Sequence, residues 1–248
     1  GFLPTNLLGN IISSNLQKII LILSLFLSMF NFYLIFNIFD KKIILREHKE
    51  DLYIFFLSII LIIFIYLSSN SGLDLIISVL SSLSNSGLTL MKSDNLSLYF
   101  LFITMIGGSL ISNTSGIKLA RFYILIKITS SEIIKLISPN SVVNKTIFGS
   151  ERKISDDNVK ISFLIFISFF LSLFILSSFL VLDNIGFEKS FKLSILTLTN
   201  TVNSELFNME NLYFSNLLTS SKISLIIFMI IGKIELVSIF LIFKKILF

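Results

Sequence analysis

The residues from Met105 to Arg121 interrupt a long apolar segment with small, hydroxyl and charged side chains. Three glycines lie within this interruption: Gly107, Gly108 and Gly116. A bilayer cannot satisfy the backbone N–H and C=O groups that a broken helix exposes, so non-helical backbone at membrane depth must lie against protein or a water-filled cavity. The interruption therefore predicts either a glycine-kinked membrane helix or an irregular segment that lines a polar pathway.

The composition predicts an integral membrane protein. Of the 248 residues, 54% are hydrophobic, and the mean hydropathy is +0.92, far above the values of soluble domains. Several apolar runs approach the roughly 20 residues that cross a bilayer. The chain has no cysteine, and its single histidine, His48, stands in a charged loop. Disulfide, thiolate and histidine-cluster chemistry is therefore not expected, and the net charge of +5 is too small to indicate a nucleic-acid partner.

Long apolar segments alternate with short ones. The predicted membrane spans are residues 17–39, 52–69, 96–136, 161–182 and 223–243. Between them lie two apolar segments that are too short to cross, residues 71–83 and 187–197. Each short segment ends in small polar residues, which is typical of a re-entrant helix that enters and leaves on the same side.

The polar ends of the two short segments are the candidate ion-binding loops. The first is Ser84, Asn85, Ser86 and Gly87, and the second runs from Thr199 through Asn200, Thr201, Val202 and Asn203. A helix that points its C-terminal end into the membrane directs partial negative charge inward. Carbonyl oxygens just beyond that end can replace the hydration shell of a cation. A buried polar turn without function is the alternative for either loop, and it is less plausible for two loops at matching positions of a repeat.

The order of span, short helix and span occurs twice, which indicates an internal repeat of about 100 residues. Residues 1–39 then end an earlier copy, 40–137 form the next repeat, and 161–248 form the last, with a cytoplasmic loop at 138–160. Twelve Lys and Arg residues fall on the side of that loop and five on the other. Because cations favour the cytoplasmic side, we expect both short helices to enter from outside.

Three cations lie within or beside the apolar zone: Lys118, Arg121 and Lys233. Ionisable residues at membrane depth are functional candidates, and Glu235 follows Lys233 two positions later. Arg121 is expected to extend toward the cytoplasmic interface. Lys118, directly after the glycines, fits that interpretation and a role in the pathway equally well.

In four places the chain resembles the TrkH/KtrB/HKT superfamily of potassium transporters, whose subunits carry four span–pore helix–span repeats. The interruption from Gly107 to Lys118 resembles the intramembrane gating loop of the third repeat. Ser84 to Gly87 resembles its filter, and Asn200 to Asn203 resembles the fourth filter. Gly232-Lys233-Ile234-Glu235-Leu236 resembles a motif of the final helix. Gly1-Phe2-Leu3-Pro4 also resembles the end of the second filter.

The resemblance implies an all-α polytopic membrane protein of repeated span–pore helix–span units with re-entrant filter loops. It implies translocation of potassium, with sodium as the second candidate ion, and this ion is the substrate and not a cofactor. The ions would bind at Gly1, at Ser84 to Gly87 and at Asn200 to Asn203. The gate would comprise Gly107, Gly108, Ser112, Gly116, Lys118 and Lys233. No catalytic residue and no cofactor are expected.

The resemblance further implies a homodimer in a bacterial cytoplasmic membrane with a cytosolic nucleotide-binding regulatory subunit similar to TrkA. The chain begins at Gly1, and we expect that the first repeat and most of the second belong to a missing N-terminal part. A membrane enzyme is a weaker hypothesis, because no pair of intramembrane carboxylates is seen.

The chain departs from the family pattern at several positions. Ile111, Asn113, Thr114 and Ser115 occupy a glycine-rich region of the gating loop, and lysine replaces arginine at position 233. Asn203 stands at the position of the fourth filter glycine, whereas aligning the two repeats with each other places Val202 there. These departures leave two hypotheses open: a cation-translocating subunit and a degenerate, non-conducting one.

Overall fold

The computed structural model describes residues 12–39, 49–67, 72–90, 96–138, 145–148, 153–201, 206–207, 209 and 217–234. Within these residues the protein is all-α apart from one pair of two-residue strands. The elements are α1 (Asn15–Met29), α2 (Phe32–Phe39), α3 (Lys49–Tyr66), α4 (Gly72–Ser84), α5 (Ser97–Met105), β1 (Ile106–Gly107), β2 (Ile117–Lys118), α6 (Leu119–Ile137), α7 (Asp156–Leu182), α8 (Phe187–Thr199) and α9 (Thr219–Ile234).

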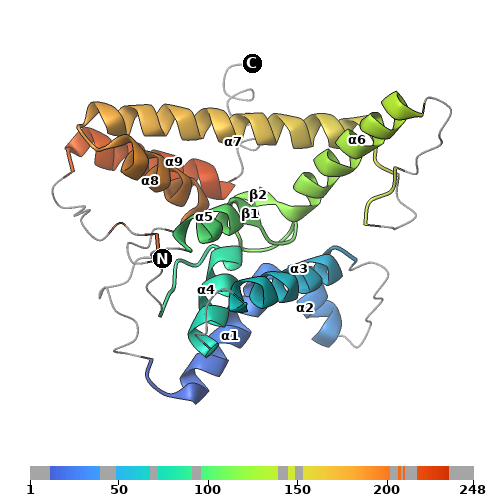
Figure 1. Cartoon of the computed structure of the whole chain (residues 1–248), viewed down its shortest axis with the longest axis horizontal. Coiled ribbons are helices and arrows are strands. Elements are labelled where there is room, and N and C mark those ends of the chain that lie inside the picture. The colour runs from blue at the N-terminus through green and yellow to red at the C-terminus, as the bar shows by residue number, and fades with distance from the viewer. Residues whose placement is uncertain are drawn as a thin grey trace.

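The helices form two groups, each built around one short helix. Helix α4 packs against α1, α3 and α5, and α8 packs against α7 and α9. Figure 1 shows the α7–α8–α9 group along the top and the α1–α4 group below, with the strand pair between them. The groups meet where α5 packs on α8 and where α6 packs on α7. The glycine interruption lies at the junction of the two groups.

Both short helices are buried on nearly every side. From Ile77 to Ser84 every residue of α4 is buried, and so is every residue of α8 from Leu193 to Thr199. Their hydroxyl groups bond to carbonyls one turn earlier, as Ser78 Oγ does to Asp74 O (2.9 Å) and Thr197 Oγ1 to Leu193 O (2.6 Å). Each helix has 13 residues, or about 20 Å, which is too short to cross a bilayer.

Helix α7 is the one described helix that is long and apolar enough to cross a membrane. Its 27 residues correspond to about 40 Å. The helix begins at Asp156, inside the region predicted as loop up to residue 160, because Ser155 caps it by accepting a hydrogen bond from Asn158 N (3.3 Å). Two of the other predicted spans are not matched by a helix of this kind for local reasons, and the span over residues 223–243 extends beyond the described residues. Helix α3 carries three charges in its first turn, and the segment of α5 and α6 is interrupted.

The prediction of one continuous span over residues 17–39 is wrong, because the helix breaks after Met29. Phe30 is extended (φ −81°, ψ 162°). Asn31 then starts a new helix by accepting a hydrogen bond from Tyr33 N at its side-chain oxygen (2.9 Å). An asparagine inside an apolar run is thus the local reason for a new helix start.

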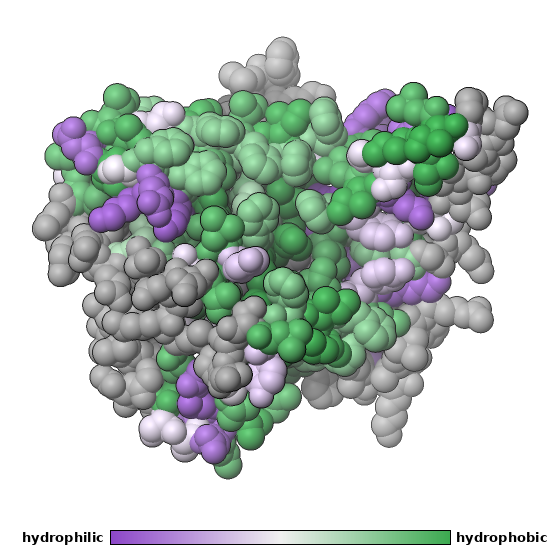
Figure 2. Space-filling view, in the orientation of Figure 1, coloured by the Kyte–Doolittle hydropathy of each residue, from purple (hydrophilic) through white to green (hydrophobic). Residues whose placement is uncertain are grey.

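Apolar side chains cover the outside of the molecule as well as its core. On α7, Phe163, Leu171, Phe174 and Phe179 are each more than half exposed. Figure 2 shows hydrophobic residues over the middle of the visible face and hydrophilic ones toward its left and right margins. Contiguous exposed apolar surface of this kind marks a membrane or interaction surface.

Candidate functional site

The C-terminal ends of the two short helices have the same backbone geometry. Asn85 follows α4 with a left-handed φ of 55°, and Asn200 follows α8 with a φ of 56°. The next residue closes the turn in each case, because Ser86 N donates to Ser81 O (3.1 Å) and Thr201 N donates to Leu196 O (2.9 Å). A left-handed residue with this pair of contacts is a standard way to end a helix, and asparagine tolerates it.

This geometry sets the correspondence between the two repeats. Asn85 corresponds to Asn200. Gly87 lies two residues after Asn85, so it corresponds to Val202, two residues after Asn200, and not to Asn203. Val202 and Asn203 lie outside the described residues, as does Gly1, so the structure gives no account of these expected ion-binding positions. The repeat-to-repeat alignment is nevertheless the one that agrees with the helix ends.

The two polar loops lie against each other. Gly87 has a φ of +71°, and a Cβ atom placed there would lie 3.3 Å from the backbone carbon of Thr201. The hydroxyls of the first loop are turned back, since Ser84 Oγ donates to Ser81 O (3.3 Å) and Ser86 Oγ lies 3.0 Å from Ser81 Oγ. The hydroxyl hydrogens of this loop are therefore used within the loop, and its backbone carbonyls are candidate groups to meet a cation.

The glycine stretch, defined here as residues 107–116, is non-helical, as the sequence predicted. The chain leaves α5 in β1 and returns in β2, which pairs with β1 in parallel through Ile106↔Ile117 and Gly107↔Lys118. Within the stretch, Gly108 N donates to Thr114 Oγ1 (2.8 Å) and Ser112 Oγ donates to Ser109 O (2.7 Å). Its backbone groups thus find partners inside the protein, as membrane depth requires.

Lys118 folds back into the glycine stretch and does not extend toward an interface. The residue is 4% exposed. Its ammonium group donates to Ser112 O (3.2 Å), to Thr114 O (2.5 Å) and to Thr114 Oγ1 (3.1 Å). Hydrogen bonds from a charged donor are stronger than neutral ones. Lys118 therefore holds the tip of the stretch together.

All three glycines of the stretch are needed for close backbone approaches. A Cβ atom at Gly107 would lie 2.3 Å from Ser115 O, and one at Gly108 would lie 2.5 Å from Met29 O. Gly116 has a φ of +75°, and a Cβ atom there would lie 2.9 Å from Met105 O. At the closest of these approaches, the backbone carbonyl of Ser115 lies against Gly107, so glycine is needed at position 107 although position 115 carries a serine.

The glycine stretch contacts both polar loops. Asn85 Nδ2 donates to Thr104 O (3.2 Å) and lies 3.3 Å from the Cβ position of Gly116. Asn200 Nδ2 donates to Met229 O (3.1 Å) and reaches Ser115 Oγ at 3.4 Å. The two left-handed asparagines thus tie each short helix to the span that follows it, and both touch the stretch.

The last span reaches the glycine stretch through Lys233, whose ammonium group donates to Asn113 O (2.6 Å). The preceding Gly232 packs directly on α8, since a Cβ atom there would lie 2.0 Å from Leu198 O. Lys233 and Lys118 therefore bind the same tip from opposite repeats. Glu235 lies outside the described residues.

Sequence reasoning missed a second set of contacts to the stretch. Glu50 and Asp51 precede the predicted span over residues 52–69, yet both belong to α3, and Asp51 is 3% exposed. Leu110 N donates to Glu50 Oε1 (2.8 Å), and Asn31 N donates to Asp51 Oδ1 (2.9 Å). The only signal in the sequence is a pair of acids at the start of an apolar run.

Ion pairs hold the other ends of the short helices. Lys18 of α1 lies 2.6 Å from Asp74 in the first turn of α4, and Lys192 lies 2.6 Å from Glu188 in the first turn of α8. The hydrogen bond from Lys192 lowers the pKa of Glu188. Acids at these ends are favoured by the helix dipole, so both helices present carboxylates at one end and carbonyls at the other.

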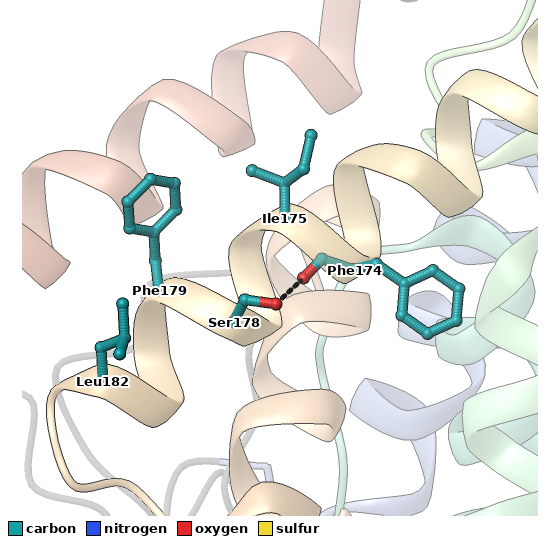
Figure 3. A pocket seen from close by; sticks show the side chains of 5 residues that line it. All are labelled: Phe174, Ile175, Ser178, Phe179 and Leu182. Atoms are coloured by element: carbon teal, nitrogen blue, oxygen red, sulfur yellow. Dashed lines mark hydrogen bonds between the residues drawn. The ribbon is translucent and has the colours of Figure 1, made fainter.

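An apolar groove on α7 is separate from this site. It is lined by Phe174, Ile175, Ser178, Phe179 and Leu182, shown in Figure 3. The one hydroxyl in it donates to Phe174 O (2.8 Å) within the same helix. The groove therefore offers no free polar group, and no metal-binding cluster of His, Asp or Glu occurs in the part of the chain that the structure describes.

Comparisons with known proteins identify the fold. No family model matches the chain, and no curated protein matches it. Among solved structures, the crystal structure of the potassium transporter TrkH from Vibrio parahaemolyticus matches with a TM-score of 0.82 and 20% sequence identity. The match covers 93% of this chain and 52% of that one. The chain therefore has the TrkH fold and spans about half the length of that transporter.

Proposed function

We propose that the chain is part of a TrkH-like membrane subunit that translocates potassium across a bacterial cytoplasmic membrane. In this proposal the subunit discriminates only weakly between potassium and sodium, so it translocates sodium as well. The observation that carries the proposal is the meeting of two short buried helices whose polar loops lie against each other at Gly87 and Thr201. Helix C-termini and backbone carbonyls together form a favourable environment for a dehydrated cation.

The glycine stretch supplies the second element of the proposed mechanism. It contacts both polar loops, through Asn85 and Asn200, and it also contacts α1 through Met29 and α9 through Lys233. A segment in this position narrows the path of an ion that has passed the loops. We therefore propose that residues 107–116 are the gate and that Lys118 and Lys233 keep its tip in place.

The alternative hypothesis of a non-conducting subunit is supported by one specific observation. When the two helix ends are aligned, Gly87 of the first loop corresponds to Val202 of the second. A β-branched residue adopts glycine-like backbone conformations only at a high cost. If the fourth loop needs such a conformation to direct its carbonyls, this chain conducts poorly or not at all. A membrane enzyme has no comparable support.

The proposed partners follow from the resemblance to TrkH-type proteins. They are a second copy of the subunit and a cytosolic nucleotide-binding regulatory subunit similar to TrkA, together with the lipid bilayer. The exposed apolar surface of α7 fits contact with lipid or with a second membrane subunit.

The test is ion uptake by the complete protein in cells that lack their own potassium uptake. We expect uptake of potassium above that of cells without the protein, with partial competition by sodium. Surface or membrane-fraction detection confirms that the protein is present. Protein in the membrane without any flux would favour the non-conducting hypothesis.

A further inference from the structure

The first turn of α3 contains two adjacent carboxylates, Glu50 and Asp51. Acids at a helix start are usually exposed and stabilised by the helix dipole. Here Asp51 is 3% exposed, and Glu50 is partly buried. Because burial of a carboxylate is costly unless it is well hydrogen-bonded, the dipole alone does not explain these positions.

Each carboxylate accepts a backbone N–H from a distant part of the chain. Glu50 Oε1 accepts from Leu110 N of the glycine stretch at 2.8 Å. Asp51 Oδ1 accepts from Asn31 N, at the break between α1 and α2, at 2.9 Å. Asn31 and Leu110 both lie outside the helices, so their N–H groups cannot form the usual hydrogen bond of a helix backbone.

The two segments bound by this acid pair also contact each other. Ser109 N donates to Met29 O (3.0 Å), and Phe32 N donates to Ile111 O (3.1 Å). Gly108 allows this approach, since its Cβ position lies 2.5 Å from Met29 O. The break in the earlier span is thus the place where the glycine stretch docks.

Two ionisable side chains bind the glycine stretch. Glu50 accepts a hydrogen bond from Leu110 N, and Lys118 donates to Ser112 O and Thr114 O near the tip. Both groups hold backbone atoms of the stretch, one a nitrogen and the other carbonyl oxygens.

We propose that Glu50 and Asp51 form a latch that fixes the resting position of the glycine stretch against the break between α1 and α2. Glu50 holds the stretch and Asp51 holds the break, so one helix turn joins the two. The stretch cannot move away from the polar loops without losing the bond to Glu50. The pair are positioning residues. The inference deepens the proposed function, and its consequence for ion flux rests on it.

The latch itself is tested without any transport, by amide hydrogen exchange in the complete purified protein. Glu50→Ala should speed exchange at Leu110 by about fivefold, the change expected when a typical hydrogen bond is removed. Asp51→Ala should act on Asn31 instead. Asp157→Asn is the matched control, because Asp157 is an exposed acid in the first turn of α7, and it should change neither amide.

Exchange at Leu110 that is unchanged in folded Glu50→Ala, or that rises equally in Asp157→Asn, would overturn the latch. If Glu50→Ala does not fold, Glu50→Gln decides the matter. It keeps an oxygen acceptor without the charge, so a smaller acceleration confined to Leu110 is expected, and no acceleration would refute the proposal.

Ion flux tests the consequence for gating. Glu50→Ala should raise passive cation leak through the complete protein, whereas Asp157→Asn should not. Faster exchange at Leu110 with unchanged leak would overturn the role of the latch in gating. If neither wild type nor variant carries cations, the proposed function fails, and the exchange result still decides whether the latch exists.

Discussion

Asn85 and Asn200 occupy equivalent positions, each in the left-handed conformation one residue beyond a 13-residue buried helix. Their side-chain amides also act alike, donating to Thr104 O and Met229 O of the span that follows. These two donors lie 115 residues apart, whereas their acceptors lie 125 apart. Of the ten additional residues, seven fall in the connection before α9 and three within the start of α9. The helix ends themselves keep one register.

Gly87→Ala should lower the ratio of potassium to sodium uptake by the complete protein. Its φ of +71° costs a residue with a Cβ roughly 1–2 kcal/mol, and the added carbon would lie 3.3 Å from the Thr201 backbone. Competitive uptake of the two ions is the measurement. Gly72→Ala is the control at the other end of α4, where a Cβ meets nothing within 4 Å. An unchanged ratio in Gly87→Ala would show that this loop does not select the ion.

Val202→Gly should raise the same uptake ratio if the register of the helix ends holds. Glycine reaches conformations that valine does not, so the fourth loop could then direct its carbonyls as the third does. Asn203→Gly is the paired variant, because matching to the family pattern selects that position instead. If only Asn203→Gly raises the uptake ratio, the second loop has one more residue than the first between the left-handed asparagine and the position that needs glycine.

Gly232→Ala should destabilise the protein. A Cβ atom there would lie 2.0 Å from Leu198 O, and backbone cannot yield as a flexible side chain can, so α8 and α9 must separate. Overpacking of this kind costs about 1–3 kcal/mol, which thermal unfolding in detergent would detect. Gly186→Ala is the control, with no atom within 4 Å of the added carbon. Equal melting temperatures for both variants would contradict the close packing of α9 on α8.

Much of the fold follows from the sequence, because its strongest signals are local. Apolar runs bounded by polar residues predicted the two short helices, with bounds within two residues of those in the structure. The glycines at 107, 108 and 116 gave the non-helical stretch, which the structure confirms. In each case the local pattern agrees with the tertiary environment, as it does in well-determined folds.

The break after Met29 could be predicted only in part. Asn31 is a local signal for a new helix start, but the groups that satisfy the interrupted backbone come from elsewhere in the chain. Phe30 and Asn31 leave the helix where Ser109, Ile111 and Asp51 supply the missing hydrogen-bond partners. Those partners come from up to 80 residues away. The acid pair of α3 was missed for the same reason, since nothing near it in the sequence indicates burial.

The two ends of α7 should lie on opposite sides of the membrane. The helix has 27 residues and a hydropathy suited to spanning, and the cation asymmetry places its start in the cytoplasm. The chain has no cysteine, so single cysteines at the exposed positions Asp157 and Asn184 can be labelled without background. Labelling of Asn184→Cys alone by an impermeant reagent in intact cells is expected. Labelling of both would refute the topology.

Lys118→Met should increase cation leak through the complete protein. Methionine keeps much of the length of lysine but loses the charged hydrogen bonds to Ser112 O and Thr114 O, each worth about 1.5–3 kcal/mol. Relief of the burial of the charge offsets part of this loss, so we expect a loosened tip in a folded protein. The control is Lys127→Met, at a partly exposed position of α6, the helix that follows Lys118. Leak that is equal in the two variants, with both proteins folded, would show that Lys118 does not hold the gate.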